Sequence, residues 1–128
     1  EQEQQHLSMN YLVLLFRACP EPELTHGLPG HADPTVITIL LQDEVPGLQV
    51  LKDGTWLAVN PIPNTFTVNV SDQIQVISND KYKSVLDRAL VNCKKERVSI
   101  PTFYFPSYDA LIGTAPHTYA SLVYRTFT

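Results

Sequence analysis

Histidine and aspartate stand two positions apart at His31 and Asp33, with only Ala32 between them. In an extended segment residues i and i+2 share a face, so the imidazole and the carboxylate point to the same side. An imidazole nitrogen and a carboxylate oxygen arranged in this way can bind one divalent metal ion. The same triplet also fits a loop histidine followed by an aspartate that caps a turn, and the spacing alone leaves both interpretations open.

A second pair with the same spacing, Arg97 and Ser99, can bind an anion. A planar guanidinium group grips a carboxylate with two parallel hydrogen bonds, and a hydroxyl on the same strand face adds a further donor. The alternative for Arg97 is an ordinary surface position on a strand. Asp87 lies in the middle of the apolar run KSVLDRALV, and it is either an exposed strand residue or a ligand directed into a site.

The elements that must position these side chains are short, β-prone segments separated by glycine and proline, which favours an all-β fold over a helical bundle. Asp53-Gly54 between two such segments predicts a hairpin. The residues between Gly27 and His31, among them Pro29, are predicted to form a connection and not a strand. The predicted strands cover residues 35–41, 48–52, 55–59, 65–70, 84–91 and 98–105, and a short helix capped by Ser71 or Asp72 covers 72–78. This pattern predicts six to eight strands, little helix, and a jelly roll or related double-sheet barrel.

Composition limits the classes of function. The chain has 128 residues, of which 44% are hydrophobic and 17% charged, enough for one domain with a core. The net charge of −4 argues against a nucleic-acid or anionic-membrane surface as the main role. The apolar run 11–16 is too short to span a bilayer, and the polar N-terminus is unlike a signal peptide. Two cysteines without a C-x-x-C pair do not suggest a disulfide framework, so we expect a reduced, cytoplasmic setting.

The stretch from about Pro20 to Ser107 resembles the plant 2-oxoglutarate- and Fe(II)-dependent dioxygenases. The resemblance is carried by HADPTVITILLQDEVPGLQV, by SVLDRALVNCKKERVSIPTFYFPS and by the residues between them. Within this family, PELTHGLPGHADP, IPNTFTVNV and SNDKYKSVL are most similar to the salicylate hydroxylases linked to downy mildew susceptibility. Flavanone 3-hydroxylases and flavonol synthases are near relatives. The resemblance implies a double-stranded β-helix of the jelly-roll type, formed by residues 1–128 as a single, incomplete domain that lacks the family's N-terminal helical region.

The resemblance also implies roles for individual residues. The family holds iron with an H-x-D…H triad, an open-sided site of two histidines and one carboxylate. An R-x-S pair and a tyrosine hold the 2-oxoglutarate, and the strand after R-x-S lines the substrate pocket. In this sequence the matching positions are His31, Asp33 and Asp87 for the metal, Arg97, Ser99 and Tyr11 for 2-oxoglutarate, and Phe103 and Phe105 for the substrate pocket.

The implied activity is hydroxylation of a small aromatic acid or flavonoid-type substrate, as in plant secondary metabolism, with decarboxylation of 2-oxoglutarate to succinate. The implied cofactors and co-substrates are Fe(II), 2-oxoglutarate and O2, with ascorbate as reductant. The expected partner is therefore a small aromatic molecule, with no nucleic acid and no membrane. The alternative is a truncated, non-catalytic paralogue that keeps the barrel and the ability to bind 2-oxoglutarate.

Besides the missing N-terminal helical region, two departures from the family pattern bear on activity. Asp87 stands where the family has the second histidine, which makes the ligand set more anionic and better suited to Mg, Ca or Mn. Two nearby carboxylates repel each other, so we expect the pKa of one of them to be raised. The family's second tyrosine is replaced by Leu12, while Phe16 falls at its spacing from Cys19. His117 is an alternative metal ligand that could replace the missing histidine.

Overall fold

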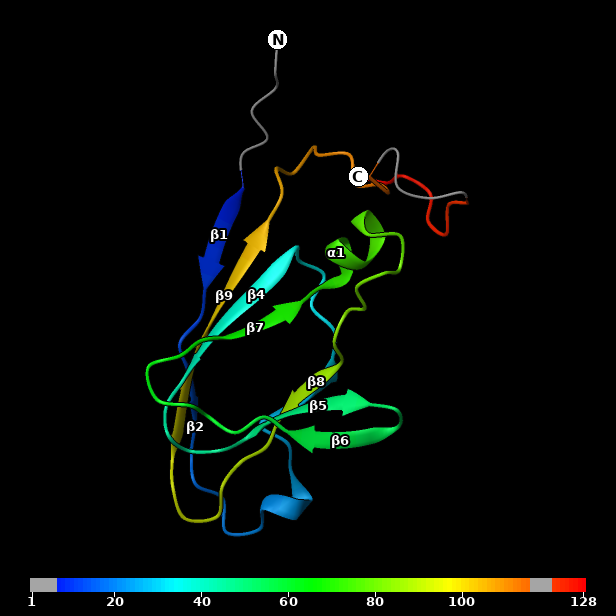
Figure 1. The fold of residues 1–128 in the computed structure, drawn as a ribbon. Helices are drawn as coiled ribbons and strands as arrows, with labels where there is room; N and C mark the ends of the chain where they lie inside the picture. The colour runs from blue at the N-terminus through cyan, green and yellow to red at the C-terminus, as the bar shows by residue number, and fades with distance from the viewer. Residues whose placement is uncertain (1–6, 116–120) are drawn as a thin grey trace.

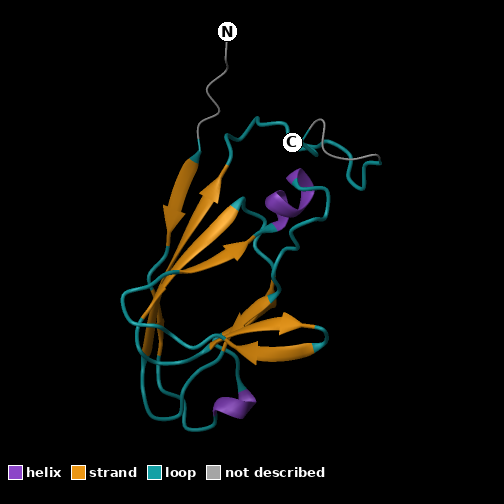
Figure 2. Cartoon of the chain, in the orientation of Figure 1, coloured by secondary structure: helices purple, strands orange, loops and turns teal. Residues whose placement is uncertain are grey.

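Two antiparallel β-sheets form the framework of the chain, and very little of it is helical (Figures 1 and 2). The computed structural model describes residues 7–115 and 121–128. This arrangement confirms the predicted all-β jelly-roll class. The strands are β1 (Ser8–Tyr11), β2 (Leu14–Phe16), β3 (Leu28–His31), β4 (Ile37–Gln42), β5 (Leu48–Lys52), β6 (Thr55–Ala58), β7 (Thr67–Val70), β8 (Asp87–Ala89) and β9 (Arg97–Phe105).

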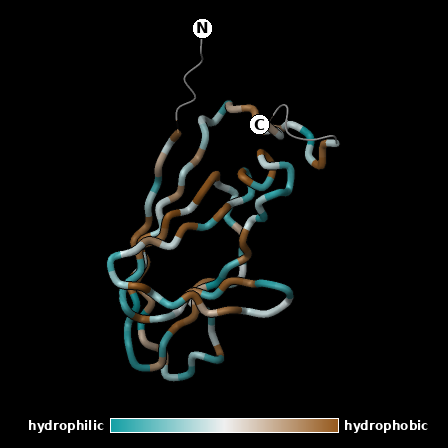
Figure 3. The backbone as a smooth tube through the Cα atoms, in the orientation of Figure 1, coloured by the Kyte–Doolittle hydropathy of each residue, from teal (hydrophilic) through white to brown (hydrophobic). Residues whose placement is uncertain are grey.

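The larger sheet is built around β9, which pairs with β4 along one edge and with both β1 and β2 along the other. Paired residues in such a sheet share a face, and neighbours along a strand alternate between faces. Tyr104 therefore lies beside Met9 and Ile37 on the outer face, while Phe103 lies beside Asn10 and Thr38 on the inner face. Apolar and polar residues recur along both sheets without forming one long hydrophobic run (Figure 3).

The smaller sheet has the order β3-β8-β5-β6 and carries the predicted hairpin. Asp53 and Gly54 both have positive φ, 50° and 78°, as a tight two-residue hairpin turn requires. The β3 strand corrects the prediction of a connection before His31. Pro29 lies inside this strand, and β3 is an edge strand, where a missing N–H costs no ladder bond.

A short α-helix, α1 (Asp72–Ile77), follows β7, as predicted, and Ser71 is its N-cap residue. Val76 from this helix packs with Ala110 and Ile112 of the C-terminal segment, and Tyr124 closes this cluster. A one-turn 3-10 helix, η1 (Pro22–Leu24), links β2 to β3. Among the described residues, no helix is long and apolar enough to cross a membrane.

Two predicted boundaries differ from the structure in an informative way. The expected strand over residues 84–91 is reduced to β8, because Val85 and Leu86 make only isolated backbone bonds to Val70 and Leu51. The two N-terminal strands were not predicted, since the sequence before Cys19 shows no alternation. They form because the long strand β9 offers a free edge along its whole length.

Candidate functional site

A cavity of about 320 Å³ lies between the two sheets. Residues from the inner face of the larger sheet form one wall, and residues of β3, β5 and β8 form the other. Most of its lining is apolar, with a few polar groups that converge on it, as is usual for small-molecule sites. The polar and charged lining residues are His31, Asp33, Thr38, Asn69, Asp87, Arg97 and Ser99.

His31 and Asp33 lie side by side at the end of β3, as their spacing predicts. The Nε2 atom of His31 is 3.5 Å from Oδ1 of Asp33. The other ring nitrogen, Nδ1, is 3.0 Å from the carbonyl oxygen of Pro29, which can only accept, so Nδ1 carries the proton and donates. In the neutral imidazole, Nε2 then keeps its lone pair and faces Asp33, which is the orientation that a metal-binding histidine needs.

The carboxylate of Asp33 is fixed from its other side. The hydroxyl of Thr38 donates to Oδ2 of Asp33 over 2.6 Å, and the hydroxyl of Thr35 lies 3.3 Å from that of Thr38. All three residues are buried. Because one oxygen of Asp33 is occupied in this way, the other remains directed toward His31 and the cavity.

Asp87 begins β8 and pairs directly with His31 across the two strands. It is only 7% exposed, and its Oδ2 accepts a 3.0 Å hydrogen bond from the side-chain amide of Asn69. The pKa of Asp87 is raised to about 6, mainly by burial and also by the charge of Asp33, while His31 and the Asn69 hydrogen bond act in the opposite direction. The expected rise in a carboxylate pKa is confirmed, but desolvation contributes more than repulsion between the two carboxylates.

The three predicted metal ligands thus line one cavity. Across residues 7–115 and 121–128, however, no three His, Cys, Asp or Glu side chains form a cluster that could hold a metal ion. The His31 and Asp33 pair fits two positions of a metal site by geometry and donor type. The role of Asp87 as a third ligand stays a prediction. His117 lies outside the described residues.

Among the described residues, Arg97 is the most deeply buried charged side chain, with 2% of its surface exposed. Its Nη2 donates to Oε1 of Gln42 over 3.0 Å, and Gln42 in turn donates to the hydroxyl of Thr67. Its Nε and Nη1 are buried and have no hydrogen-bond partner in the described residues. Burial lowers the pKa of Arg97, and the charge of Asp43 raises it in part. A buried cation with unpaired donors costs free energy unless an anion accepts hydrogen bonds from those donors. The end of the cavity beside Ser99 therefore fits a carboxylate.

The walls around Arg97 leave its side chain little freedom. The ring of Phe16 lies over the guanidinium group, 5.2 Å from Cζ to the ring centroid, and the two residues pair between β2 and β9. A methyl group at Gly47 would meet Cδ of Arg97 at 2.8 Å. The resemblance alone did not assign Phe16 to the site, although its spacing from Cys19 pointed there.

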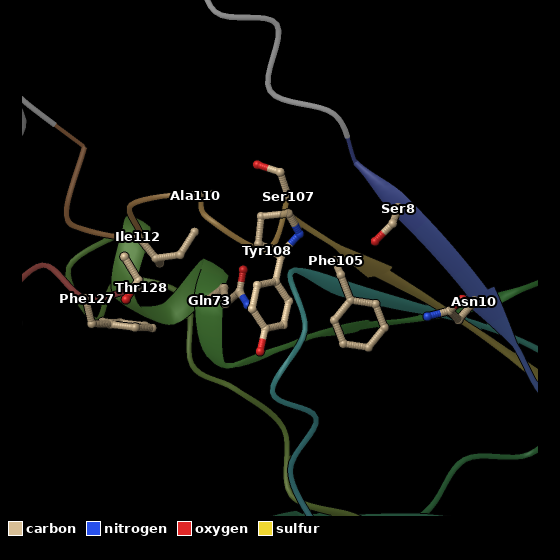
Figure 4. A pocket seen from close by; sticks show the side chains of 11 residues that line it. Ser8, Asn10, Gln73, Phe105, Ser107, Tyr108, Ala110, Ile112, Phe127 and Thr128 are labelled. Atoms are coloured by element: carbon tan, nitrogen blue, oxygen red, sulfur yellow. The ribbon is translucent and has the colours of Figure 1, made fainter.

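The remaining predicted residues fall in different places. Phe103 lines the cavity. Phe105 instead lines a second cavity of about 430 Å³ between β1, α1 and the C-terminal segment, together with Gln73 and Tyr108 (Figure 4). Tyr11 is 65% exposed and pairs with Thr102, and it is not part of the cavity lining. The structure therefore brings neither Phe105 nor Tyr11 to the site.

Sequence reasoning missed Thr38, Gln42 and Asn69, which hold the charged residues in place. A signal for them was present in the sequence. Thr38 and Gln42 are polar residues on the same face of strand β4, which is otherwise mostly apolar. Asn69 is a polar residue in β7. Polar residues on the inward positions of a buried strand indicate a polar site on that face.

Comparison with known proteins identifies the family of this arrangement. Residues 3–106 match the model of the 2OG-Fe(II) oxygenase superfamily. The chain is 64% identical over 127 residues to Protein DMR6-LIKE OXYGENASE 1 of Arabidopsis thaliana, covering 96% of this chain and 35% of that protein. It is 47% identical over 131 residues to Flavanone 3-dioxygenase 2 of Oryza sativa subsp. japonica, covering 99% of this chain and 37% of that protein.

Solved structures agree with this match. The crystal structure of JOX2 in complex with 2OG, Fe and JA superimposes with a TM-score of 0.76 at 50% sequence identity, over 86% of this chain and 32% of that chain. The chain spans about a third of the length of the curated relatives that it matches.

Proposed function

The chain belongs to the 2OG-Fe(II) oxygenase superfamily, and we propose that it carries the iron- and 2-oxoglutarate-binding part of an oxygenase that hydroxylates a small aromatic acid or flavonoid. The reaction consumes O2 and converts 2-oxoglutarate to succinate, with ascorbate as reductant. The observation that carries the proposal is Arg97, a buried cation with two unpaired donors in a cavity that also contains His31 and Asp33.

Arg97 and Ser99 bind the distal carboxylate of 2-oxoglutarate in this proposal. Both side chains are buried on the inner face of β9, and the cavity extends from them toward His31. Gln42 holds one nitrogen of the guanidinium group, so the plane of the group is fixed before the ligand arrives. A preorganised donor loses little freedom on binding, which favours affinity.

His31 and Asp33 hold Fe(II), with Nε2 of His31 and Oδ1 of Asp33 as the donor atoms. When bound, the iron supplies the oxidising chemistry with O2 and 2-oxoglutarate. The residues of this chain orient the ligand atoms, through Pro29 for His31 and through Thr38 for Asp33. Asp87 of β8 would be the third ligand; it does not form a three-residue cluster with His31 and Asp33 in the described residues, so its side chain would have to move toward them, and it would bind as the carboxylate present above its pKa of about 6.

The substrate lies against the apolar wall formed by Leu40, Pro101 and Phe103. A planar aromatic compound packs well on such a wall, and its polar groups face the charged end of the cavity. One relative supports this class, since it is a flavanone dioxygenase, and a solved relative crystallised with JA supports a small-molecule substrate more generally.

Anaerobic visible absorption tests the proposal. Fe(II) and 2-oxoglutarate are added to the chain, to its Asp87→His variant, and to an Arg97→Met variant as a matched control. A bidentate Fe(II)–2-oxoglutarate chelate gives a charge-transfer band. We expect this band in the chain and in Asp87→His, and we expect Arg97→Met to need a far higher 2-oxoglutarate concentration.

The other outcomes separate the components of the proposal. A band only in Asp87→His would show that the anionic ligand set prevents iron binding. It would overturn the proposed oxygenase activity of the chain that carries Asp87. No band in either folded protein would leave the non-catalytic paralogue as the correct interpretation. Circular dichroism of each protein establishes that it is folded.

A further inference from the structure

We propose that Cys19 and Cys93 form a disulfide bond that joins the segment after β2 to the turn between β8 and β9. These are the only two cysteines of the chain, so there is no competing pair within it. Both are free thiols here, with Cys19 half-buried and Cys93 exposed. They lie far apart in sequence, and the pairing of β2 with β9 brings the segment of Cys19 to the turn that carries Cys93.

One backbone hydrogen bond places the two residues next to each other. The N–H of Cys19 donates to the carbonyl oxygen of Asn92 over 2.9 Å. That carbonyl belongs to the planar peptide unit that ends at the Cα atom of Cys93. Standard bond lengths then bring the Cα atoms of the two cysteines within about 7 Å of each other. Disulfides span Cα–Cα distances of about 4.4–6.8 Å, and the limit of about 7 Å lies just beyond that range, so the bond needs rotation of both side chains and an adjustment of the turn that turns the two Cβ atoms toward each other.

The turn that carries Cys93 is already ordered by local bonds. The side-chain oxygen of Asn92 accepts from the N–H groups of Lys94 and Lys95, at 2.8 and 3.0 Å. On the other side, Phe16 precedes Cys19 by three positions and packs on Arg97. The disulfide would therefore fix the segment after β2 to the turn that leads into β9, the strand that begins with Arg97. We expect it to stabilise the anion-binding end of the cavity.

Glutathione disulfide is a sufficient oxidant. The thiolate of exposed Cys93 attacks one sulfur of glutathione disulfide, forms a mixed disulfide and releases one glutathione thiolate. The thiolate of Cys19 then attacks the Cys93 sulfur of that mixed disulfide and releases the second glutathione. Two electrons pass from the protein thiols to glutathione disulfide, and the two thiol protons end on the released glutathione molecules.

Redox equilibration with mass spectrometry tests the inference. The 128-residue chain is equilibrated with reduced and oxidised glutathione in set ratios, in buffer and in concentrated urea, and is then quenched with acid. We expect a monomeric product lighter by two hydrogen atoms, with a cross-linked peptide that contains both cysteines. Because folding holds the thiols together, the effective concentration of one thiol at the other should be at least about tenfold higher in buffer than in urea.

Three results would overturn the inference: equal effective concentrations in buffer and urea, glutathione attached to Cys93 without the cross-link, or covalent dimers as the main product. Cys19→Ser and Cys93→Ser are matched controls that cannot form the bond. Oxidation should raise the melting temperature of the chain by at least about 5 °C and leave both controls unchanged. An oxidised chain that melts no higher than the reduced chain would also contradict the proposal. Neither readout depends on oxygenase activity, so this inference stands or fails independently of the proposed function.

Discussion

Replacing Asp87 with asparagine should stabilise the metal-free chain at neutral pH. Asp87 is buried, and its carboxylate has one hydrogen-bond donor, Asn69, in the structure. Ionising Asp87 in this buried position costs free energy in the folded chain. It costs nothing comparable in the unfolded chain, where the carboxylate is hydrated. Asparagine has almost the same shape and keeps an oxygen that can accept the hydrogen bond from Asn69.

The size of the effect follows from the pKa of Asp87, which is raised from 3.8 to about 6 in the folded chain. A raised carboxylate pKa means that the folded state holds its proton more tightly, so stability falls as the pH rises between these two values and is constant above them. At pH 7.5 the ionised carboxylate lowers the free energy of unfolding by about 3 kcal/mol in full. About 1.4 kcal/mol of this decrease develops between pH 5 and pH 7.5.

Urea unfolding in the presence of a chelator, at pH 5 and at pH 7.5, measures this cost. The difference between the chain and Asp87→Asn should grow by about 1.4 kcal/mol from the lower to the higher pH. Comparing the two pH values removes any constant difference in packing or hydrogen bonding between the two side chains. Asp109→Asn, at an exposed position, is the control and should change equally little at both pH values.

A pH dependence that is the same in the chain and in Asp87→Asn would refute the reasoning. It would mean that the carboxylate is hydrated in the folded state, or that a cation compensates it. An opposite sign, with Asp87→Asn losing stability relative to the chain as the pH rises, would show that the ionised carboxylate is favoured by its surroundings.

Three further predictions concern the same cavity. Arg97→Lys keeps the charge but loses the planar group, and it should weaken 2-oxoglutarate binding by at least about tenfold in an anaerobic titration. Gly47→Ala should destabilise the chain by about 1–3 kcal/mol in urea unfolding, because the new methyl group meets Arg97 and the carbonyl oxygen of Leu90. Thr38→Val removes the hydrogen bond to Asp33 and should lower affinity for Mn(II) by about tenfold in a metal titration, whereas Thr38→Ser should keep it.

Much of the fold could be predicted because its signals are local. The turn at Asp53-Gly54 needs residues that tolerate positive φ, and it brings the two flanking segments together as neighbouring strands. Helix α1 follows a serine in extended conformation and begins where predicted. In contrast, β1 and β2 depend on pairing with β9, from which they are separated by most of the chain. No local pattern carries that information.

The site shows the same division. The spacing of His31 and Asp33 fixes their common face, and the structure places them 3.5 Å apart. The partners that orient them come from other strands, and only the tertiary structure brings Thr38 to Asp33 or Gln42 to Arg97. The resemblance to the family located the charged residues, but it also assigned Tyr11 and Phe105, which the register of β1 and the end of β9 place elsewhere.

Asp87 connects the stability of the chain with its proposed chemistry. The burial that raises its pKa also makes its charge available to a cation, because an uncompensated carboxylate in this cavity gains the most from a positive partner. If iron is that partner, binding must release the proton held below pH 6, and metal affinity must rise with pH up to that value. Asp87→His would shift this dependence toward the titration of an imidazole. The pH dependence of metal affinity in these two proteins therefore decides whether Asp87 is a ligand or only a buried acid beside the site.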